Sequence, residues 1–225
     1  MNIKRSEILI FALPKGRILE ELMPLMKLTN IIPEKSFFDP KDRRLLFSSN
    51  IDWLQLIRVR SFDAATFVAF GGADLGVVGS DVLQEFNYPE LYSPLDLMVG
   101  KCRLSLAKLK SDSIDKDYQY AWDHIKIASK YPGITKEYFA NKGLNVDCIK
   151  MSGAIELAPS LGLSNYIVDL VSSGKTLKAN GLEEVDRIAD ISSRLVVNRT
   201  AFKTRTKKIG EIISRFQEAL NGKNT

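Results

Sequence analysis

The chain has 225 residues, of which 45% are hydrophobic and 26% are charged, and its 32 basic against 27 acidic side chains leave a net charge of +5 at pH 7. This length and composition suit one large domain or two small lobes with buried cores, and they argue against a disordered chain. No apolar stretch approaches the roughly 20 residues needed to cross a bilayer. Two cysteines and one histidine, His124, argue against a disulfide framework, a zinc site or a Ser-His-Asp triad, and we expect His124 to be structural.

The first apolar run, residues 8–14, passes directly into Lys15, Gly16 and Arg17 without a small-residue cleavage site. We therefore expect no signal peptide, and a cytoplasmic protein. The positive charge is compatible with a nucleic acid, an anionic lipid or a heavily phosphorylated small substrate. The basic residues are dispersed and the aromatic residues lie in apolar runs, whereas nucleic-acid-binding surfaces interleave the two. We expect neither a nucleic-acid partner nor a membrane partner.

Short apolar runs alternate with helical patterns along the chain, which is typical of an α/β protein. Residues 8–13 are apolar on both faces and predict a buried strand, and apolar residues at helical spacing over 18–26 predict a helix after it. Further strands are predicted at 45–48, 53–59, 74–78, 103–108, 125–128, 146–149 and 166–170, and within 185–197. Further helices are predicted at 62–70, from 81, at 135–142, from 155 and at 209–220, with an irregular polar segment at 111–123.

The pattern of apolar and polar residues changes near residue 99, which predicts two α/β lobes with the second inserted in the first. We expect lobe I to comprise residues 1–98 and 185–225 and lobe II to comprise residues 99–184, with a cleft between them. Ligands in such folds bind at the carboxyl ends of strands. The loops after Leu13, Val78 and Leu170 are therefore the places where a site is expected.

The loop after the strand at 166–170 carries the most information. Its sequence from Asp169 to Thr176 ends in Gly-Lys-Thr, but a Walker A phosphate loop needs a glycine where this chain has Asp169, which disfavours a nucleoside triphosphatase. Backbone N–H groups and the hydroxyls of Ser172, Ser173 and Thr176 would cradle a single phosphate, and Gly174 would allow its close approach. Asp169 is suited to accept hydrogen bonds from sugar hydroxyls, so a ribose 5-phosphate would satisfy both features. The simpler interpretation is an acidic strand end followed by a polar turn.

A wider segment resembles the signature of the ATP phosphoribosyltransferase family, whose members open histidine biosynthesis. The match spans 22 residues and comprises Glu156, Gly162, Ser164, Ile167, Asp169, Leu170, Ser173, Gly174, Thr176 and Leu177. Segments 12–17, 58–63, 73–83 and 100–107 are similar to other conserved parts of the family. The resemblance extends from about residue 8 to about residue 215.

The resemblance implies a two-lobed fold with mixed sheets and a central cleft, like a type II periplasmic binding protein. It implies a glycosyltransferase (a pentosyltransferase) that joins ATP to phosphoribosyl pyrophosphate with Mg²⁺ on the pyrophosphate. The chain stops soon after residue 220, as in the short, catalytic form of the family. In that form the resemblance implies a homodimer of catalytic subunits that joins a regulatory subunit, similar to a histidyl-tRNA synthetase, in a hetero-octamer.

The resemblance also assigns roles to residues. Lys15, Arg17 and Asp169 are the candidate catalytic residues, and Asp169, with Glu156 as a second candidate, orients the ribose hydroxyls. The candidate 5-phosphate loop comprises Ser172, Ser173, Gly174, Lys175 and Thr176. The candidates on the ATP and pyrophosphate side are Lys15, Arg17, Arg43, Arg58, Arg60 and Asp81. No metal ligand is assigned to the protein itself.

Several of these residues have simpler interpretations. Lys15 and Arg17 would also suit a solvated helix start. Arg58 and Arg60, two apart on one strand face, would also suit a surface pairing with Asp63. A different class of protein, a non-catalytic two-lobed solute-binding protein, would share the fold but act without turnover.

Overall fold

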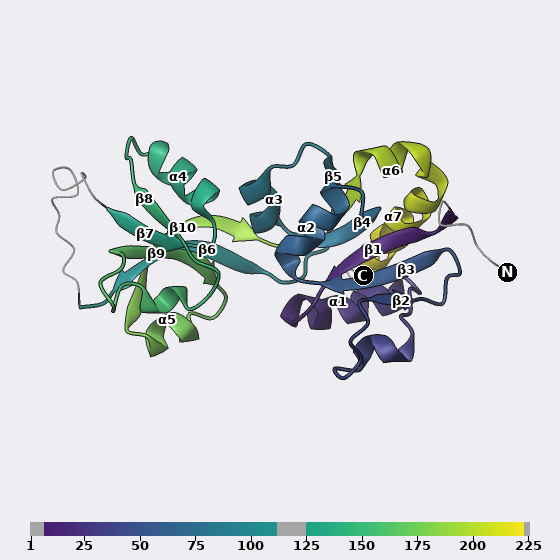
Figure 1. Ribbon diagram of the computed structural model, residues 1–225, viewed down its shortest axis with the longest axis horizontal. Helices are drawn as coiled ribbons and strands as arrows, with labels where there is room; N and C mark the ends of the chain where they lie inside the picture. The colour runs from purple at the N-terminus through teal and green to yellow at the C-terminus, as the bar shows by residue number, and fades with distance from the viewer. Residues whose placement is uncertain (1–6, 112–124, 223–225) are drawn as a thin grey trace. The chain divides into compact units, whose positions relative to one another are not determined.

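The computed structural model describes residues 7–111 and 125–222, and it divides into two compact units (Figure 1). Unit 1 contains the described residues up to 83 together with 87–100 and 192–222, and unit 2 contains 84–86 and the described part of 101–191. The expected lobe boundary at 184/185 falls inside strand β10 (Leu182–Ile191), which pairs with β6 (Cys102–Leu109) along its whole length. Residues 185–191 therefore lie in unit 2. Most of the segment expected to be irregular, and His124, lie outside the described residues.

Unit 1 is built on a six-stranded mixed sheet with the order β2-β3-β1-β4-β11-β5. Its strands are β1 (Leu9–Pro14), β2 (Leu46–Ser48), β3 (Leu54–Val59), β4 (Leu75–Gly79), β5 (Leu91–Asp96) and β11 (Ser193–Asn198). β1 is parallel to both β3 and β4, so the carboxyl ends of these three strands meet at one edge of the sheet. β2 pairs antiparallel with β3, and β11 pairs antiparallel with β4 and β5.

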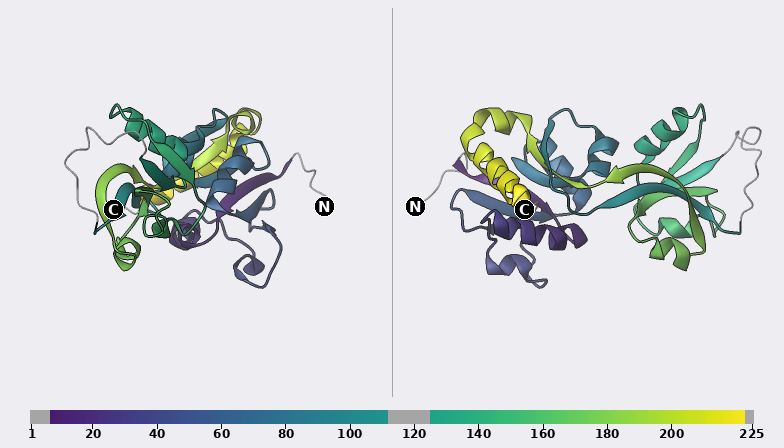
Figure 2. Two further views of the ribbon diagram at one scale, coloured as in Figure 1. Left: turned by 60° about the vertical axis from the view of Figure 1, so that its left-hand side comes forward. Right: turned by 180° about the vertical axis from the view of Figure 1, so that it is seen from behind.

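Helices cover both faces of the unit 1 sheet. They are α1 (Arg17–Leu28), α2 (Ser61–Ala69), α6 (Arg199–Thr204) and α7 (Thr206–Asn221), with a 3-10 turn η2 (Lys35–Phe38). Helix α3 (Ser80–Phe86) follows β4, and its residues 84–86 belong to unit 2. α7 lies beside α1 (Figure 2), and Phe216 of α7 packs edge-on against Phe11 of β1 with ring centroids 6.0 Å apart. On the other face α2 approaches β4 so closely that a Cβ on Gly76 would meet Val68 Cγ2 at 2.8 Å. Glycine at this position is what lets the helix lie on the sheet.

Unit 2 is built on a five-stranded mixed sheet with the order β10-β6-β9-β7-β8. Its remaining strands are β7 (Lys126–Ser129), β8 (Asp147–Lys150) and β9 (Tyr166–Val171). β9 is parallel to β7 and antiparallel to β6. Helix α4 (Pro132–Ala140) lies on one face of the sheet and α5 (Lys175–Ala179) on the other (Figure 1). The 3-10 turn η4 (Ile155–Leu157) packs with α5 on the second face, where Ile155, Ile167 and Leu177 share a buried cluster.

The expected α/β class with mixed sheets is confirmed, and each predicted strand has a counterpart within a few residues. The helix expected from residue 155 is wrong, because the chain makes a single 3-10 turn there. The sequence patterns did not predict β5 and α6. Pro94 within β5 argues against a strand, and the structure places β5 at the edge of the sheet, where a proline is tolerated. In the described part of the chain, no helix is both long and apolar enough to span a membrane.

Candidate functional site

The expected 5-phosphate loop of unit 2 is a tight turn between β9 and α5. Ser172 and Ser173 follow the last residue of β9, and Gly174 precedes the first residue of α5. Gly174 has φ +73°, a left-handed conformation that glycine adopts without the steric cost of a side chain. Ser172 and Ser173 are exposed, as are Lys175 and Thr176 at the start of α5. The turn therefore presents its hydroxyls and the first peptide groups of a helix to solvent, as a phosphate cradle requires.

Asp169 lies inside β9, two residues before its end, and it is half-buried. Alternation along the strand puts it on the same face as Ile167 and Val171, which pack under α5 and η4. Its Oδ1 accepts a hydrogen bond of 2.8 Å from the N–H of Leu170. The carboxylate is thus held on the sheet face from which the loop and α5 rise.

Glu156 comes to the same face through a different element. It is the central residue of η4, which contacts β9, and it is half-buried. The residue before η4, Ala154, has φ +51°. A left-handed conformation in a residue with a side chain costs roughly 1–2 kcal/mol and is common where a functional segment must be held in one shape. Ala154 was not predicted from the sequence, because a lone alanine does not indicate such a conformation.

In unit 1 the expected cationic turn follows β1. The N–H of Lys15 donates to the carbonyl of Val59 on the neighbouring strand over 2.9 Å. Gly16 then adopts φ +87° and ψ −154°, a region that is essentially restricted to glycine, and α1 begins at Arg17. Lys15 and Arg17 are both exposed, and Arg17 pairs with Glu21 one helical turn later at 3.3 Å. The turn carries two cations at the carboxyl end of a buried parallel strand.

Two further candidates lie at the same edge of the sheet. Arg60 follows β3 and is exposed at the N-cap of α2, so it lies outside the strand that contains Arg58. Its backbone is still extended (φ −74°, ψ 154°), so the alternation that would put Arg60 on the same face as Arg58 continues to this residue. Asp81 is buried in the first turn of α3, just after β4, and a Cβ on Gly79 would come within 2.1 Å of its Oδ1. The carboxylate of Asp81 thus lies against Gly79, where a larger residue would force the carboxylate to move.

Arg58 and Arg43 lie elsewhere in unit 1. The Arg58 guanidinium donates to the carbonyl of Phe37 at 2.5 Å and to that of Asp42 at 3.3 Å. It also stacks over the Phe37 and Phe47 rings, at 5.7 and 5.3 Å from their centroids. These contacts hold the segment 37–42 against the sheet. Arg43 follows that segment and is exposed.

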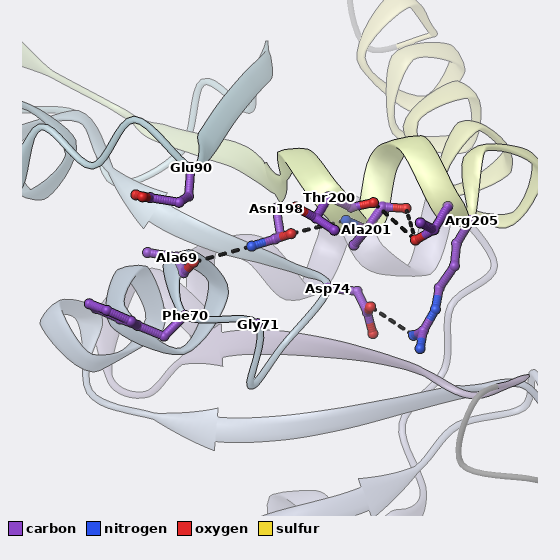
Figure 3. Close-up of a pocket in the computed structure, with 10 residues that line it drawn as sticks. Ala69, Phe70, Gly71, Asp74, Glu90, Asn198, Thr200, Ala201 and Arg205 are labelled. Atoms are coloured by element: carbon purple, nitrogen blue, oxygen red, sulfur yellow. Dashed lines mark hydrogen bonds and ion pairs between the residues drawn. The ribbon is translucent and has the colours of Figure 1, made fainter.

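A cavity of about 410 Å³ in unit 1 lies away from these residues (Figure 3). Its walls include Asp74, Asn198 and Arg205, and Asp74 precedes β4, at the opposite end of the strand from Asp81. Asp74 accepts a hydrogen bond from Arg205 at 2.7 Å (Figure 3) and another from the N–H of Ile10 at 2.8 Å. Burial raises the pKa of Asp74, against the opposing effects of these two partners. Asp74 therefore has a structural role, because its hydrogen bonds join β1 and Arg205 to the start of β4.

Comparison with known proteins decides the family. Residues 60–218 match the family model described as ATP phosphoribosyltransferase. The chain is 58% identical over 211 residues to the ATP phosphoribosyltransferase of Rhodospirillum rubrum, which covers 94% of this chain and 92% of that relative. The chain belongs to the ATP phosphoribosyltransferase family. It is also 47% identical over 218 residues to the ATP phosphoribosyltransferase of Neisseria meningitidis serogroup C, with 96% of this chain and 98% of that relative covered.

Solved structures agree with the family and with the fold. An ATP phosphoribosyltransferase (HisG:HisZ) complex from Thermotoga maritima contains a chain that is 33% identical, with a TM-score of 0.79, and the match covers 96% of this chain and 100% of that one. The periplasmic aliphatic sulphonate binding protein SsuA of Escherichia coli matches with a TM-score of 0.56 at 14% identity, over 95% of this chain and 72% of that one. The second likeness concerns the fold alone and confirms the expected type II architecture.

Within this family member, the structure brings the candidate residues into two groups. In unit 2, the loop 172–176, Asp169 and η4 gather on one face of one sheet. In unit 1, Lys15, Arg17, Arg60 and Asp81 follow three adjacent strands at one sheet edge. Among the residues that the structure describes, no group of three or more His, Cys, Asp or Glu side chains forms a metal cage.

Proposed function

We propose that the chain catalyses the first step of histidine biosynthesis, the reaction of ATP with phosphoribosyl pyrophosphate to give N1-(5-phosphoribosyl)-ATP and pyrophosphate. The observation that carries the proposal is the turn from β9 through Gly174 into α5, which has the residues of the family signature in a shape suited to one phosphate. The proposal is further supported by relatives of this name that match almost the whole chain.

Unit 2 binds the phosphoribosyl group. The hydroxyls and N–H groups of the loop 172–176 donate hydrogen bonds to the oxygens of the 5-phosphate, and the side chain of Lys175 adds a positive charge beside it. Asp169, on the sheet face beneath α5, accepts hydrogen bonds from the ribose hydroxyls, with Glu156 of η4 as a second acceptor. These contacts fix the ribose so that C1 is presented to the nucleophile, which lowers the entropic part of the barrier.

Unit 1 supplies the positive charge for the polyphosphates. Lys15 and Arg17 after β1, with Arg60 after β3, neutralise the phosphates of ATP and the departing pyrophosphate. Each hydrogen bond to a charged group typically contributes about 1.5–3 kcal/mol. Arg43 is a further candidate for binding these phosphates, because it is exposed. Arg58 acts indirectly, because it holds the segment 37–42 in place. Asp81 shapes the turn after β4 in which it lies.

The chemistry needs no covalent enzyme intermediate. N1 of the adenine attacks C1 of the ribose, the bond from C1 to the pyrophosphate oxygen breaks with its electron pair leaving on pyrophosphate, and C1 is inverted. Positive charge develops on the ribose and negative charge on the leaving group, so fixed charges and positioning dominate catalysis. N1 already carries a lone pair, so no general base is required.

Mg²⁺ fits this arrangement as a cation carried by the substrate. It is usually bound by one or two carboxylates together with substrate phosphates and water. Among the described residues, Asp169 and Glu156 belong to no group of three or more His, Cys, Asp or Glu side chains that would form a cage, which suits an ion already held by the pyrophosphate. When bound, Mg²⁺ would neutralise the leaving group.

The partner proposal rests on the relative from Thermotoga maritima, which was solved as a HisG:HisZ complex. We propose that this chain likewise forms a homodimer that joins a regulatory subunit, similar to a histidyl-tRNA synthetase, in a hetero-octamer in the cytoplasm. The partner would confer activation and histidine inhibition. Co-purification of the two tagged subunits, with histidine inhibition appearing when both are present, would support it, and histidine inhibition of the chain alone would contradict it.

The activity is tested by mixing the chain with its regulatory subunit, ATP, phosphoribosyl pyrophosphate, Mg²⁺ and pyrophosphatase, and following the absorbance of phosphoribosyl-ATP. Formation of this product that requires both substrates is expected. Binding of a substrate without any turnover, with the partner present, would favour the non-catalytic solute-binding alternative.

A further inference from the structure

The carbonyl of Ser172, the first residue of the 5-phosphate loop, is bound by an arginine from another strand. Arg103 lies near the start of β6, opposite Val171 in the sheet register. Its Nη1 donates to the Ser172 carbonyl oxygen over 3.1 Å. The contact joins residues 69 positions apart in the sequence. A loop that is otherwise exposed is therefore attached to the sheet at its entrance.

Arg103 is held by Glu184, and Glu184 is in turn bound by Ser105. Its Nε and Nη2 donate to the two carboxylate oxygens of Glu184 on β10, at 2.6 and 2.5 Å. The hydroxyl of Ser105, which is 1% exposed, donates to the same carboxylate at 2.7 Å. A two-pronged pairing of this kind fixes the plane of a guanidinium as well as its position. Three neighbouring strands, β9, β6 and β10, thus contribute to one network.

The charges within the network are matched. The Arg103 guanidinium holds the pKa of the Glu184 carboxyl below its usual range, and the Ser105 hydroxyl acts in the same direction against the effect of burial. At neutral pH the pair is therefore ionised on both sides. Since Glu184 binds the Nε–Nη2 edge of the guanidinium, the remaining nitrogen, Nη1, is free to donate to the Ser172 carbonyl.

The geometry of the peptide bond gives this contact a consequence for phosphate binding. In a planar trans peptide the C=O and the following N–H point in opposite directions. A carbonyl of Ser172 that is directed at Arg103 therefore directs the N–H of Ser173 away from it. A charged donor on the carbonyl also polarises the peptide group, which makes that N–H a stronger donor. The N–H of Ser173 is among the groups proposed above to bind the 5-phosphate.

We propose that Arg103, held by a Glu184 carboxylate that Ser105 also binds, is a positioning residue for phosphoribosyl pyrophosphate: it fixes the Ser172–Ser173 peptide so that the Ser173 N–H is oriented before the 5-phosphate arrives. The inference rests on the proposed function, since it assumes that the loop 172–176 binds that phosphate. Arg103 acts through the loop and does not itself need to touch the substrate.

The test compares Arg103→Met with Lys142→Met. Lys142 also pairs with a carboxylate of β10, that of Asp186 at 2.8 Å, but it follows α4 on the other face of the sheet. Both variants remove one positive charge and one ion pair from unit 2. We expect Arg103→Met to raise the KM for phosphoribosyl pyrophosphate about tenfold, since one well-placed donor is worth roughly 1–1.5 kcal/mol, and to leave the KM for ATP unchanged. Lys142→Met should leave both unchanged.

A second variant and a direct probe cover the case in which Arg103→Met folds poorly. Arg103→Lys keeps the charge but cannot donate to both Glu184 oxygens and to the Ser172 carbonyl with the geometry of a guanidinium. Its KM for phosphoribosyl pyrophosphate should therefore lie between those of the unsubstituted chain and Arg103→Met. In ¹H–¹⁵N spectra of the unsubstituted chain, ribose 5-phosphate should shift the Ser173 amide, and this shift should shrink in Arg103→Lys. Equal increases in both KM values, or a Ser173 shift as large as in the unsubstituted chain, would overturn the inference. Absence of turnover and of any ribose 5-phosphate shift in the unsubstituted chain would overturn the proposed function itself.

Discussion

Unit 1 and unit 2 each contain a turn in which a strand passes through a positive-φ glycine into a helix, and the two turns are equipped differently. Gly16 leads from β1 into the 12 residues of α1 and is flanked by the cations Lys15 and Arg17. Gly174 leads from β9 into the five residues of α5 and is flanked mainly by hydroxyls. The first turn offers charged side chains, which suit polyphosphates of varying position. The second offers peptide groups and hydroxyls at fixed positions, which suit a single phosphate.

The two turns also differ in the hydrogen bond that attaches each of them to its sheet. The first is fastened to the sheet by the Lys15 N–H, which donates to the Val59 carbonyl. The second is fastened through a carbonyl bound by Arg103. Binding through side chains tolerates small movements of the backbone, whereas binding through N–H groups does not. The loop of unit 2 therefore depends more on its surroundings than the turn of unit 1 does.

The largest expected effect concerns the ribose contact of unit 2. Asp169→Asn should lower kcat by about a hundredfold, since a small misplacement of the reacting groups costs about that much, while the thermal midpoint changes little. Asp147→Asn, an exposed aspartate on β8 of the same sheet, is the matched control and should keep full activity. The measurement is initial rate at saturating substrates, and full activity of Asp169→Asn would exclude its ribose role.

Substitution in the charged turn of unit 1 should lower activity nearly as much as Asp169→Asn does. Lys15→Met should lower kcat/KM by roughly ten- to a hundredfold, which corresponds to one charged hydrogen bond of about 1.5–3 kcal/mol. Lys27→Met, which changes an exposed lysine in the last turn of α1, should have no such effect. The effect of Lys15→Met should weaken in high salt, because both partners are accessible to counterions. A rate unchanged by the substitution would leave Lys15 as a solvated residue at the start of a helix.

Alanine at the two glycines compares the turns directly. Gly16 lies in a region almost exclusive to glycine, so Gly16→Ala should lower the free energy of unfolding by about 1–3 kcal/mol. Gly174 lies in the left-handed region, where alanine costs about 1–2 kcal/mol, and a Cβ there would meet nothing closer than 4.0 Å. Gly174→Ala should instead raise the KM for phosphoribosyl pyrophosphate by more than its stability loss suggests. Urea unfolding measures the loss of stability in both variants, and kinetics measures their KM for phosphoribosyl pyrophosphate. A larger loss of stability in Gly174→Ala, with a larger rise in KM in Gly16→Ala, would contradict this prediction.

The smallest expected effect concerns pH. The folded-state pKa of Glu184 is lowered from the ordinary 4.5, chiefly by Arg103, with Ser105 and Arg187 acting in the same direction. The carboxylate therefore contributes stability above pH 4.5, and this contribution is lost as the pH falls through the lower, folded-state pKa. Because the pair is partly exposed, we expect Glu184→Gln to cost less than about 1 kcal/mol at pH 7. The difference from the unsubstituted chain should shrink toward pH 3 in urea titrations, and a difference that grows on acidification would reverse the sign assigned here.

Much of the site was predictable because its parts are local in sequence. The order Asp169, Ser172, Ser173, Gly174, Thr176 after an apolar run specifies a strand, a glycine turn and its hydroxyls within eight residues. The cations after the strand at 8–13 follow the same logic. Such features depend on alternation, on glycine's freedom at positive φ and on the placement of polar groups at strand ends, all of which are visible in a single chain segment.

What the sequence determined by itself, then, is the α/β alternation, the signature turn and the family that it indicates. The tertiary structure alone decided that β5 accepts a proline at the sheet edge, that Arg58 binds the carbonyls of Phe37 and Asp42, and that Arg103, paired with Glu184, binds the loop after β9. These contacts join residues far apart along the chain, the last pair by 81 positions. Which strands become neighbours depends on the packing of whole sheets and helices, and no local pattern records that order.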